Sequence, residues 1–371
     1  MITISLCMIV KNEEEVLERC LASAAGVADE IIVVDTGSTD GTKEIARRCG
    51  AKVFDFAWTD DFAAARNYSF SKASCDYLLW LDADDVLPEQ TRQGLILLRE
   101  KLDPRVDMVL LPYHVAFDAA DRPTFVYYRE RLMRREAGFR WEGEVHEVIA
   151  PAGIRLELPL PVEHRKLKPS EPGRNLRIFE GLLRKGRELT PRQQFYYARE
   201  LVGAGRDKEA AAAFARFLDD GRGWVEDNIG ACLELAACRE RLGNREEALA
   251  DVFRSFVFDD PRAEACCAAG DILLRSQSWT RAAYWYRLAL SCRAPESRLA
   301  FYRPDFASFY PLLQLCVCYD RLGDRETAES YHRRARALKP EDPAVQYNER
   351  YFASLHGTEQ ESPCKDRGEP V

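Results

Sequence analysis

The feature that most constrains the fold is the alternation of short apolar runs with amphipathic stretches over the first hundred residues. Short apolar runs between turns are typical of buried strands, and apolar residues at helical spacing are typical of helices that cover a sheet. We expect strands at residues 2–10, 30–34, 52–54 and 77–81, and helices at residues 13–25, 42–49, 62–73 and 89–101. This order predicts a mostly parallel sheet covered by helices.

The chain changes its pattern twice after this region. Residues 108–117, 124–131 and 144–149 are β-rich, and a turn separates the first two segments, so we expect three further strands. After Pro172 the sequence becomes almost wholly helical. We therefore predict an α/β domain over residues 1–168, helical repeats over residues 173–355, and a polar, disordered tail over residues 356–371.

The helical part contains an internal repeat. Four alanines fall early in a second helix after a short turn, at spacings of 38, 34 and 46 residues: Ala210, Ala248, Ala282 and Ala328. The tetratricopeptide unit has about 34 residues, and residues 297–308 are inserted before the last repeat. Such units bury their apolar faces only by stacking, so an all-α solenoid is predicted, with a plain helical bundle as the alternative.

Composition and termini restrict the class of protein. The formal net charge of −8 argues against broad nucleic-acid binding, because surfaces that bind phosphate backbones are basic. The twelve cysteines include no CxxC pair, which disfavours a zinc site and favours a reducing compartment. The apolar N-terminus lacks the basic region and cleavage site of a signal peptide, and no apolar run approaches the ~20 residues of a membrane span. We therefore expect a cytoplasmic protein without a transmembrane segment.

An acidic cluster at the end of a predicted strand is the strongest chemical signal. Asp82, Asp84 and Asp85 follow the apolar residues 77–81, and three carboxylates are not tolerated in a core without compensating charge. The carboxyl edge of a parallel sheet faces the crevice where ligands bind. Residues two apart on extended backbone point the same way, so Asp82 and Asp84 can converge on one Mg²⁺ or Mn²⁺ ion. The alternative is an acidic turn in which Asp85 caps the helix that follows.

Two further polar residues are expected near this edge. Asp35 ends the strand at residues 30–34, and its carboxylate can accept hydrogen bonds from a base or a ribose, although a capped turn would explain the Gly and Ser residues after it. No GxGxxG or P-loop motif is present. Arg66 lies on the first turns of the helix at residues 62–73, where its guanidinium can order the acidic site or reach phosphate oxygens. A plain surface arginine is equally compatible with the pattern.

Taken in order, these motifs resemble the GT-A-fold, family-two inverting glycosyltransferases. The matching segments are MIVKNE at 8–13, VDTGSTDGT at 34–42, ARN at 65–67 and DADD at 82–85. Thr36 follows Asp35 where many family members carry serine or a second aspartate, as in a subgroup that bears C-terminal tetratricopeptide repeats. The resemblance covers roughly residues 2–150 and, more loosely, the repeats behind them.

The resemblance implies roles for the acidic residues. Asp35 would contact the base or ribose of the nucleotide, Asp82 would lie near the ribose and the metal, and Asp84 would ligate the metal. The implied donor is a nucleoside diphosphate sugar, with a UDP-sugar favoured, and the implied cofactor is Mn²⁺ or Mg²⁺. The bound ion would offset the charge that develops on the departing nucleoside diphosphate.

A second constellation supplies the candidate base. The segment RWEGEVHE at 140–147 carries Glu144, His146 and Glu147, and the repeat-bearing subgroup is similar here, with a His-Glu pair. On extended backbone His146 and Glu144 share one face and Glu147 lies on the other. An inverting transfer needs a base that deprotonates the acceptor, so we assign Glu147 as base, His146 as metal or diphosphate contact, and Glu144 as the rival base. A solvated edge strand is the alternative.

The predicted function is therefore the metal-assisted, inverting transfer of a hexose to a peptide, protein or glycan acceptor that the repeats hold. Two other classes stay open. One is a catalytically inactive adaptor that binds protein partners through its repeats, and the other is a nucleotidyltransferase, whose sites also combine carboxylates with a metal on phosphate. Homo-oligomer formation is also left open by the sequence.

Overall fold

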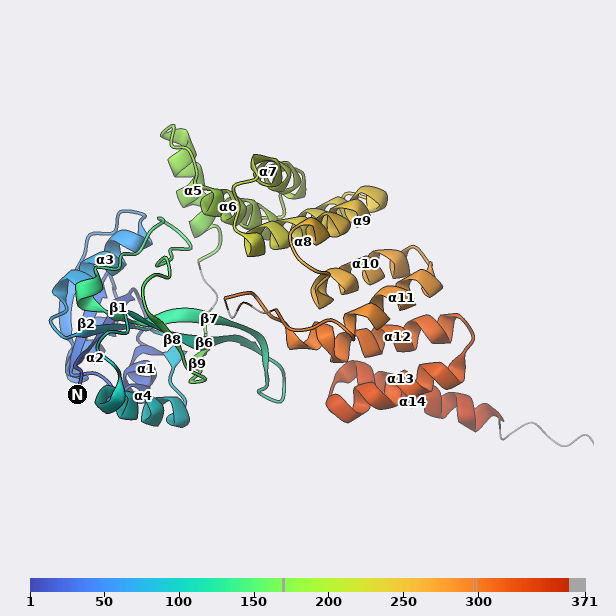
Figure 1. Cartoon of the computed structure of the whole chain (residues 1–371), viewed down its shortest axis with the longest axis horizontal. Helices are drawn as coiled ribbons and strands as arrows, with labels where there is room; N and C mark the ends of the chain where they lie inside the picture. Colours follow the sequence, from blue (N-terminus) through green and yellow to red (C-terminus); the bar gives the residue numbers. More distant parts are fainter. Residues whose placement is uncertain (169–170, 296, 298, 360–371) are drawn as a thin grey trace, which may run out of the picture. The chain divides into compact units, whose positions relative to one another are not determined.

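The computed structural model describes residues 1–168, 171–295, 297 and 299–359 (Figure 1). The chain forms two compact units. The first comprises Met1–Asp118, Pro123–Gly243 and Pro295–Tyr302, and the second comprises Ala119–Arg122, Asn244–Ala294 and the chain from Arg303 onward. The first unit holds the sheet and the first helices of the helical part, so these two portions are described together.

The predicted alternation of strands and helices is present in the first unit. The strands are β1 (Ile4–Val10), β2 (Glu30–Asp35), β3 (Lys52–Asp55) and β4 (Tyr77–Trp80), and the helices are α1 (Leu17–Ser23), α2 (Thr42–Arg48), α3 (Phe62–Lys72) and α4 (Glu89–Lys101). β1 pairs in parallel with β2 and β4, and β2 pairs in parallel with β3. The carboxyl ends of β1, β2 and β4 therefore meet at one edge of the sheet.

Both faces of these strands are covered. On β1, Ile4, Leu6 and Met8 pack in one cluster with buried residues of α1, α2 and α4, whereas Cys7 packs in a second cluster with residues of α3. The alternation follows the period of two along a strand, and it explains why the strand sequences are apolar at nearly every position. α1 and α4 lie together on one face of the sheet in Figure 1, and α3 lies on the other.

Five further strands extend the sheet through both antiparallel and parallel pairs. The full order is β3-β2-β1-β4-β7-β6-β9-β5, and β8 also pairs with β6. The added strands are β5 (Asp85–Val86), β6 (Met108–Phe117), β7 (Pro123–Arg134), β8 (Arg155–Glu157) and β9 (Val162–His164). β7 pairs antiparallel with both β4 and β6, and β5 pairs antiparallel with β9. The first two β-rich segments of the sequence are therefore strands as predicted.

One local prediction and one local alternative were wrong. Residues 144–149 are not a strand: a loop runs between Glu142 and Val148, which form an isolated bridge, and His146 has a positive φ of 52°. Side chains of the following helices hold this loop, and the alternating sequence pattern contains no information about them. Asp85 does not cap α4, whose N-cap is Pro88, because Asp85 belongs to β5 and its carboxylate pairs with Arg131.

The helical part begins at Arg174. In the first unit it comprises α5 (Arg174–Arg184), α6 (Pro191–Gly203), α7 (Asp207–Asp220) and α8 (Val225–Arg241). The second unit contains α9 (Arg245–Arg254), α10 (Ala263–Arg275), α11 (Trp279–Ala289), α12 (Phe309–Arg321), α13 (Arg325–Leu338) and α14 (Pro343–Glu359). Three short 3₁₀ helices complete the described elements: Arg135–Ala137, Ser255–Val257 and Pro304–Ala307.

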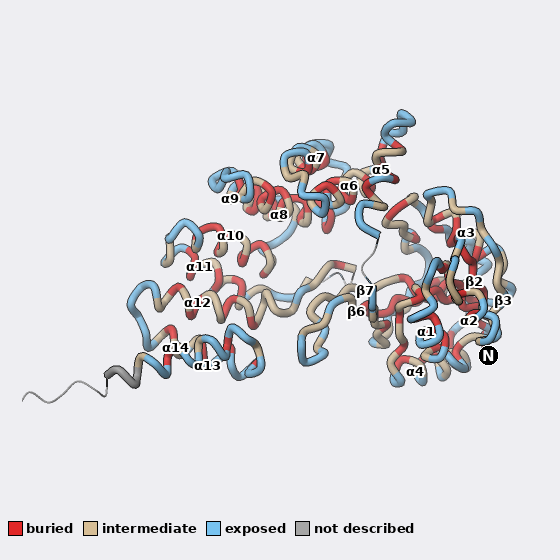
Figure 2. The backbone as a smooth tube through the Cα atoms, turned by 180° about the vertical axis from the view of Figure 1, so that it is seen from behind, coloured by how far each residue is buried: buried red, intermediate tan, exposed pale blue. Residues whose placement is uncertain are grey.

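The repeat alanines lie where the sequence places them. Ala210, Ala248, Ala282 and Ala328 are each fully buried, on α7, α9, α11 and α13. The preceding helices α8 and α12 stop at turns in which Gly243 and Gly323 have φ values of 88° and 80°, which only glycine adopts without strain. Figure 2 shows that the helices carry their buried positions on one side and exposed positions on the other. The fold class is thus confirmed: an α/β domain followed by tetratricopeptide-like helical repeats.

The limits of the predicted segments stay predictions. β9 ends at His164 and α5 starts at Arg174, which leaves the predicted boundary in the connection between them. Helix α14 includes the first residues of the predicted tail, and residues 360–371 lie outside the described part of the chain. Across the helices that the structure describes, none is both long and apolar enough to cross a membrane.

Candidate active site

A cavity of about 780 Å³ opens at the carboxyl edge of the parallel strands. Its walls come from the ends of β1 and β4, the loop before α3, the loop at residues 145–147, the segment after β9 and the first turn of α5. The lining contains acidic side chains (Glu13, Asp82, Asp84, Glu147) and basic ones (Arg66, Arg129, Lys166, Lys168). A concave site with several convergent charged groups is the usual form of a binding or catalytic site.

Arg66 joins two of the predicted site residues. Its Nη2 lies 2.6 Å from an oxygen of Asp82, and its Nε lies 2.6 Å from an oxygen of Glu147. The guanidinium is buried, with the rings of Trp141 and Trp80 at 4.7 Å and 5.1 Å. Burial alone would raise the pKa of Asp82, but Arg66 lowers this pKa to about 2. Arg66 therefore keeps Asp82 ionised on the wall of the cavity, and it is not a surface arginine.

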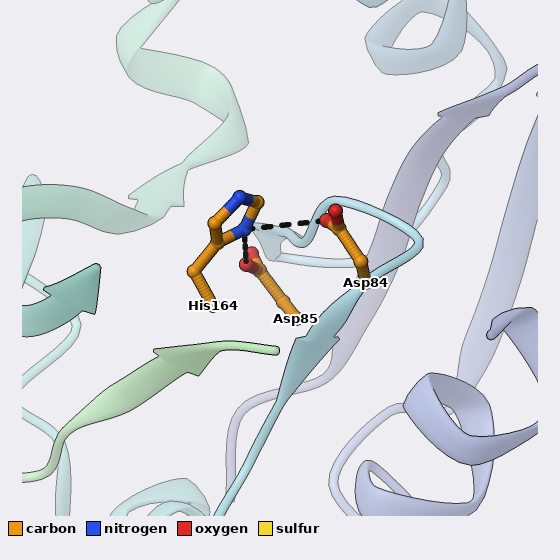
Figure 3. A group of neighbouring side chains, drawn as sticks. All are labelled: Asp84, Asp85 and His164. Atoms are coloured by element: carbon orange, nitrogen blue, oxygen red, sulfur yellow. Dashed lines mark hydrogen bonds and ion pairs between the residues drawn. The ribbon is translucent and has the colours of Figure 1, made fainter. Parts of the chain in front are cut away.

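Asp84 lies next to a histidine that the sequence analysis did not select. His164, the last residue of β9, has its Nδ1 3.3 Å from a carboxylate oxygen of Asp84 and 3.3 Å from one of Asp85 (Figure 3). Burial opposes the charged imidazolium, but the hydrogen bonds with both carboxylates raise the pKa of His164 to about 10. Asp84 and His164 line the cavity, whereas Asp85 is fully buried behind them.

The protein itself satisfies the carboxylate of Asp85. One oxygen accepts a hydrogen bond from the hydroxyl of Tyr113 at 2.8 Å, and the other accepts from Arg131 at 2.9 Å and from the backbone N–H of Asp82 at 3.0 Å. Asp85 thus ties the DADD segment to β6 and β7. This role leaves Asp84 and His164 as the members of the cluster that face the cavity.

The donor set fits a divalent metal ion. Ligand atoms of Asp84, Asp85 and His164 all lie within 4.8 Å of one another, and carboxylate oxygens with an imidazole nitrogen are suitable ligands for Mn²⁺. Glu13, which also lines the cavity, supports this fit. Burial, followed by the charges of Asp84 and Asp82, raises the pKa of Glu13 to about 7. The carboxylates of Glu13, Asp82 and Asp84 therefore lie close enough to repel one another, and a bound cation would relieve this repulsion.

Asp35 is at the predicted edge, but its carboxylate points into its own turn. Asp35 is buried, with 1% of its surface exposed, and it accepts hydrogen bonds from the backbone N–H groups of Gly37 at 3.1 Å and Ser38 at 3.0 Å. Its neighbour Thr36 lines the cavity, and Asp35 does not. The carboxylate thereby fixes the turn that presents Thr36 to the site.

The loop between Glu142 and Val148 separates the two candidate bases, Glu144 and Glu147, and carries His146 between them. His146 and Glu147 both line the cavity, although a strand would have put them on opposite faces. Glu144 does not line it: Glu144 accepts a hydrogen bond from Gln193 at 2.6 Å and pairs with Arg187 at 3.0 Å. His146 lies 2.8 Å from Glu200 of α6 and is not part of the cluster with Asp84.

The structure therefore brings together Arg66, Asp82, Asp84, His146 and Glu147 on one cavity and adds His164 and Glu13. Glu13 belongs to the MIVKNE motif, so the resemblance could have indicated it. His164 had no comparable signal, because β9 has only three residues and no motif surrounds it. The pairing of β9 with β5 and β6 places it beside the acidic cluster.

Comparison with known families agrees with this geometry. Residues 5–156 match the family model described as glycosyl transferase family 2. The matched residues include all of β1 but its first residue, β2–β4, the acidic cluster and the loop that carries Glu147. The N-terminal domain is therefore similar to glycosyl transferase family 2, and the resemblance seen in the sequence is confirmed.

Individual relatives cover parts of the chain. A TPR repeat-containing protein of Synechococcus elongatus is 39% identical over 158 residues, which are 42% of this chain and 38% of that protein. The SPbeta prophage-derived glycosyltransferase SunS of Bacillus subtilis is 29% identical over 226 residues, 56% of this chain and 51% of that protein. The match thus spans about half or less of these relatives.

One similar solved structure is glucosyl-3-phosphoglycerate synthase of Mycobacterium tuberculosis with Mn²⁺, UDP-glucose and phosphoglyceric acid. Its TM-score is 0.27 at 25% identity, and the match covers 30% of this chain and 44% of that one.

Proposed function

We propose that this protein is a metal-dependent glycosyltransferase that moves a sugar from a nucleoside diphosphate sugar to an acceptor with inversion of the anomeric carbon. The observation that carries the proposal is the convergence of Arg66, Asp82, Asp84 and Glu147 on one cavity of a domain that is similar to glycosyl transferase family 2. These residues come from separate segments, and no demand of core packing explains why their charged groups meet at a cavity.

Asp84 and His164 are the residues that would hold Mn²⁺ or Mg²⁺, with Asp85 behind them. A bound ion supplies electrostatic stabilisation of the departing nucleoside diphosphate. His164 takes the place that we first assigned to His146, because His164 has the carboxylates of Asp84 and Asp85 beside it. Asp82 stays next to the predicted ribose position, where Arg66 keeps it ionised.

The donor would occupy the cavity from its nucleoside end to its sugar end. Thr36 and the end of β1 line the part of the cavity near Asp35, and we assign this part to the base and ribose. Lys166 and Lys168 lie in the segment after β9 and line the cavity. Their ammonium groups are suited to the charge of a diphosphate, because hydrogen bonds between ionised partners are the stronger kind. A UDP-sugar remains our favoured donor.

Glu147 is our candidate for the base. In the transfer, the acceptor atom forms a bond to the anomeric carbon, the bond from that carbon to the diphosphate oxygen breaks, and the acceptor proton moves to Glu147. Glu147 lines the cavity and its carboxylate pairs with Arg66, whereas the carboxylate of Glu144 is bound by Gln193 and Arg187. These contacts favour Glu147 over Glu144.

The helical repeats would hold the acceptor. Tetratricopeptide-like arrays often bind peptides or proteins, so a peptide or protein acceptor is our first choice and a glycan the second. A cytoplasmic location and the formation of homo-oligomers remain predictions.

The function can be tested with a panel of UDP-, GDP- and CDP-sugars in Mn²⁺, Mg²⁺ or EDTA. We expect one donor to release its nucleoside diphosphate only with metal, and NMR of the freed sugar to show an inverted anomeric centre. Thermal shift with UDP, GDP and CDP, with and without Mn²⁺, reports binding independently of turnover. Release of pyrophosphate would indicate nucleotidyl transfer, and the absence of any metal-dependent nucleotide binding would indicate an adaptor.

A further inference from the structure

The loop at residues 143–148, which carries His146 and Glu147, has few contacts of its own. Glu142 and Val148 exchange two backbone hydrogen bonds of 2.9 Å and 3.1 Å at its base, and the backbone N–H of Phe62 donates to the carbonyl of Glu144 at 2.9 Å. Loops with so few internal bonds depend on neighbouring elements for a single conformation. Here the neighbouring element is helix α6. Helices α5 and α6, the first helical pair, belong to the same compact unit as the loop.

Helix α6 holds the loop first through Glu144. Gln193, at the first turn of α6, donates its amide N–H to the carboxylate of Glu144 at 2.6 Å, and Arg187, just before the helix, pairs with the same carboxylate at 3.0 Å. Gln193 is itself fixed in a capping box with Thr190, so the donor is held in place by the start of the helix.

The second and larger contact is with His146. Its ring stacks on the ring of Tyr196 with centroids 4.0 Å apart and planes 17° apart, and its Nε2 lies 2.8 Å from Glu200. Asn175 of α5 donates to the same carboxylate of Glu200 at 3.0 Å. Although burial acts in the opposite direction, the hydrogen bonds from His146 and Asn175 lower the pKa of Glu200, so this carboxylate is ionised and accepts from both.

The backbone of His146 explains why these contacts are needed. His146 has a φ of 52°, in the left-handed region that strains the backbone of a residue with a β-carbon. Its carbonyl accepts a hydrogen bond from Arg192 of α6 at 3.2 Å, and Arg192 also lies over the ring of Tyr196 at 4.7 Å. Three side chains of α6 therefore stabilise a backbone conformation that the loop would otherwise leave.

We propose that Tyr196 and Glu200 are positioning residues of the sugar-transfer site: they fix His146 and, through the adjoining backbone, hold Glu147 against Arg66 on the cavity wall. This inference rests on the proposed function. It makes the first helical pair a part of the catalytic apparatus, in addition to any role of the repeats in binding the acceptor. A catalytic loop held in this way is ordered before the substrate binds, which is what positioning of a base requires.

The experiment compares disruptive and conservative variants in the full-length protein. Tyr196→Leu and Glu200→Leu remove the stacking and the hydrogen bond, whereas Tyr196→Phe and Glu200→Gln retain a ring and a hydrogen-bond acceptor. Gln194→Ala is the matched control on the same helix, because the side chain of Gln194 donates to the carbonyl of Leu189 and not to the loop. Amide hydrogen exchange of residues 143–148 and donor turnover are measured for each, with the nucleotide sugar that the panel identifies.

In the two leucine variants we expect amide exchange in the loop to rise about tenfold or more and kcat to fall about 10- to 100-fold, with the donor KM within about threefold of the original protein. The conservative variants and Gln194→Ala should stay within about threefold in both measurements. Unchanged loop exchange in the leucine variants, or faster exchange without loss of kcat, would overturn the inference.

Failure of the proposed function is distinguishable from these results. It appears as an unmodified protein that turns over no donor of the panel, and it removes the catalytic part of the inference as well. Failure of the positioning role alone appears in an active protein whose loop or kcat does not respond to Glu200→Leu. Since the side chain of Glu200 is 23% exposed, this variant is also the one that least disturbs the packing of α6.

Discussion

The two edges of the parallel strands both carry buried carboxylates, but the partners that surround these carboxylates differ. At the amino edge, Glu30 at the start of β2 accepts hydrogen bonds from Ser5 Oγ at 2.7 Å, Lys52 Nζ at 2.7 Å and the backbone N–H of Ser74 at 2.9 Å. Burial alone would raise the pKa of Glu30, but Lys52, Ser5 and Ser74 lower it to about 2. Here the protein supplies every partner that the charge needs.

At the carboxyl edge the acidic groups crowd one another. The pKa of Glu13 is raised to about 7 by burial and by Asp84 and Asp82, and the pKa of His164 is raised to about 10 because its hydrogen bonds with Asp84 and Asp85 outweigh burial. The same residue type on the same sheet is thus satisfied at one edge and crowded at the other. Crowded charge on a cavity indicates a ligand that completes it, and satisfied charge indicates a contribution to folding.

The largest expected effect concerns Asp84. Asp84→Asn should lower metal-dependent donor turnover by about 10³-fold or more, because it removes the carboxylate assigned to the metal. Its melting temperature without metal should stay within about 2 °C of the original protein, since Asp84 lies in a crowded cluster, and the rise in melting temperature with Mn²⁺ should disappear. Undiminished turnover in this variant would remove Asp84 from the site.

The next effect concerns the base. Glu147→Gln keeps the shape of the side chain and an oxygen for Arg66 but cannot take up a proton, so kcat should fall about 10²- to 10⁴-fold with the donor KM within about threefold. Glu144→Gln is the matched variant, because its side-chain oxygen can still accept from Gln193, and we expect a loss below about tenfold. Steady-state kinetics of both decide the assignment: the opposite ranking would make Glu144 the base.

Much of the fold and of the carboxyl edge could be predicted from the sequence. The apolar run at residues 30–34 predicted β2 within one residue, and the motifs DADD and ARN placed Asp82, Asp84 and Arg66 at one edge. The prediction succeeded because parallel strands with covered faces must be apolar throughout, so a charged residue at a strand end stands out. The buried repeat alanines were predicted for a similar reason, since a fixed period repeats the same packing.

The sequence did not predict contacts between residues that are far apart in the chain. The alternation in residues 144–149 fits a strand, but Tyr196 and Glu200, more than 45 residues later, fix His146 in a left-handed conformation. His164 reaches Asp84 because β9 pairs with β5 and β6. In each case the deciding partner is distant in sequence, and a local pattern contains no information about it.

The amino edge yields a stability prediction of the opposite kind. Glu30→Gln should destabilise the first unit by about 2 kcal/mol at pH 7 and leave donor turnover at 25 °C unchanged, because Glu30 is far from the cavity lining. The folded-state pKa lies below the ordinary value, so the contribution is present above about pH 4.5 and is lost as the pH falls toward 2. Melting curves from pH 7 to pH 3.5 should therefore show the difference between the two proteins narrowing. A constant difference would show that the charge of Glu30 does not stabilise the first unit.

The smallest effect tests whether Glu30 and Ser5 act together. Ser5 is fully buried; its hydroxyl donates to Glu30 and accepts from the backbone N–H of Cys75 at 3.2 Å. Ser5→Ala should cost about 1 kcal/mol in urea unfolding, with no change in turnover. Combined with Glu30→Gln, the loss should be smaller than the sum of the two single losses, because both variants disturb one hydrogen bond. Strict additivity would mean that Lys52 and Ser74 alone satisfy Glu30, and the amino edge would then depend on fewer partners than its geometry indicates.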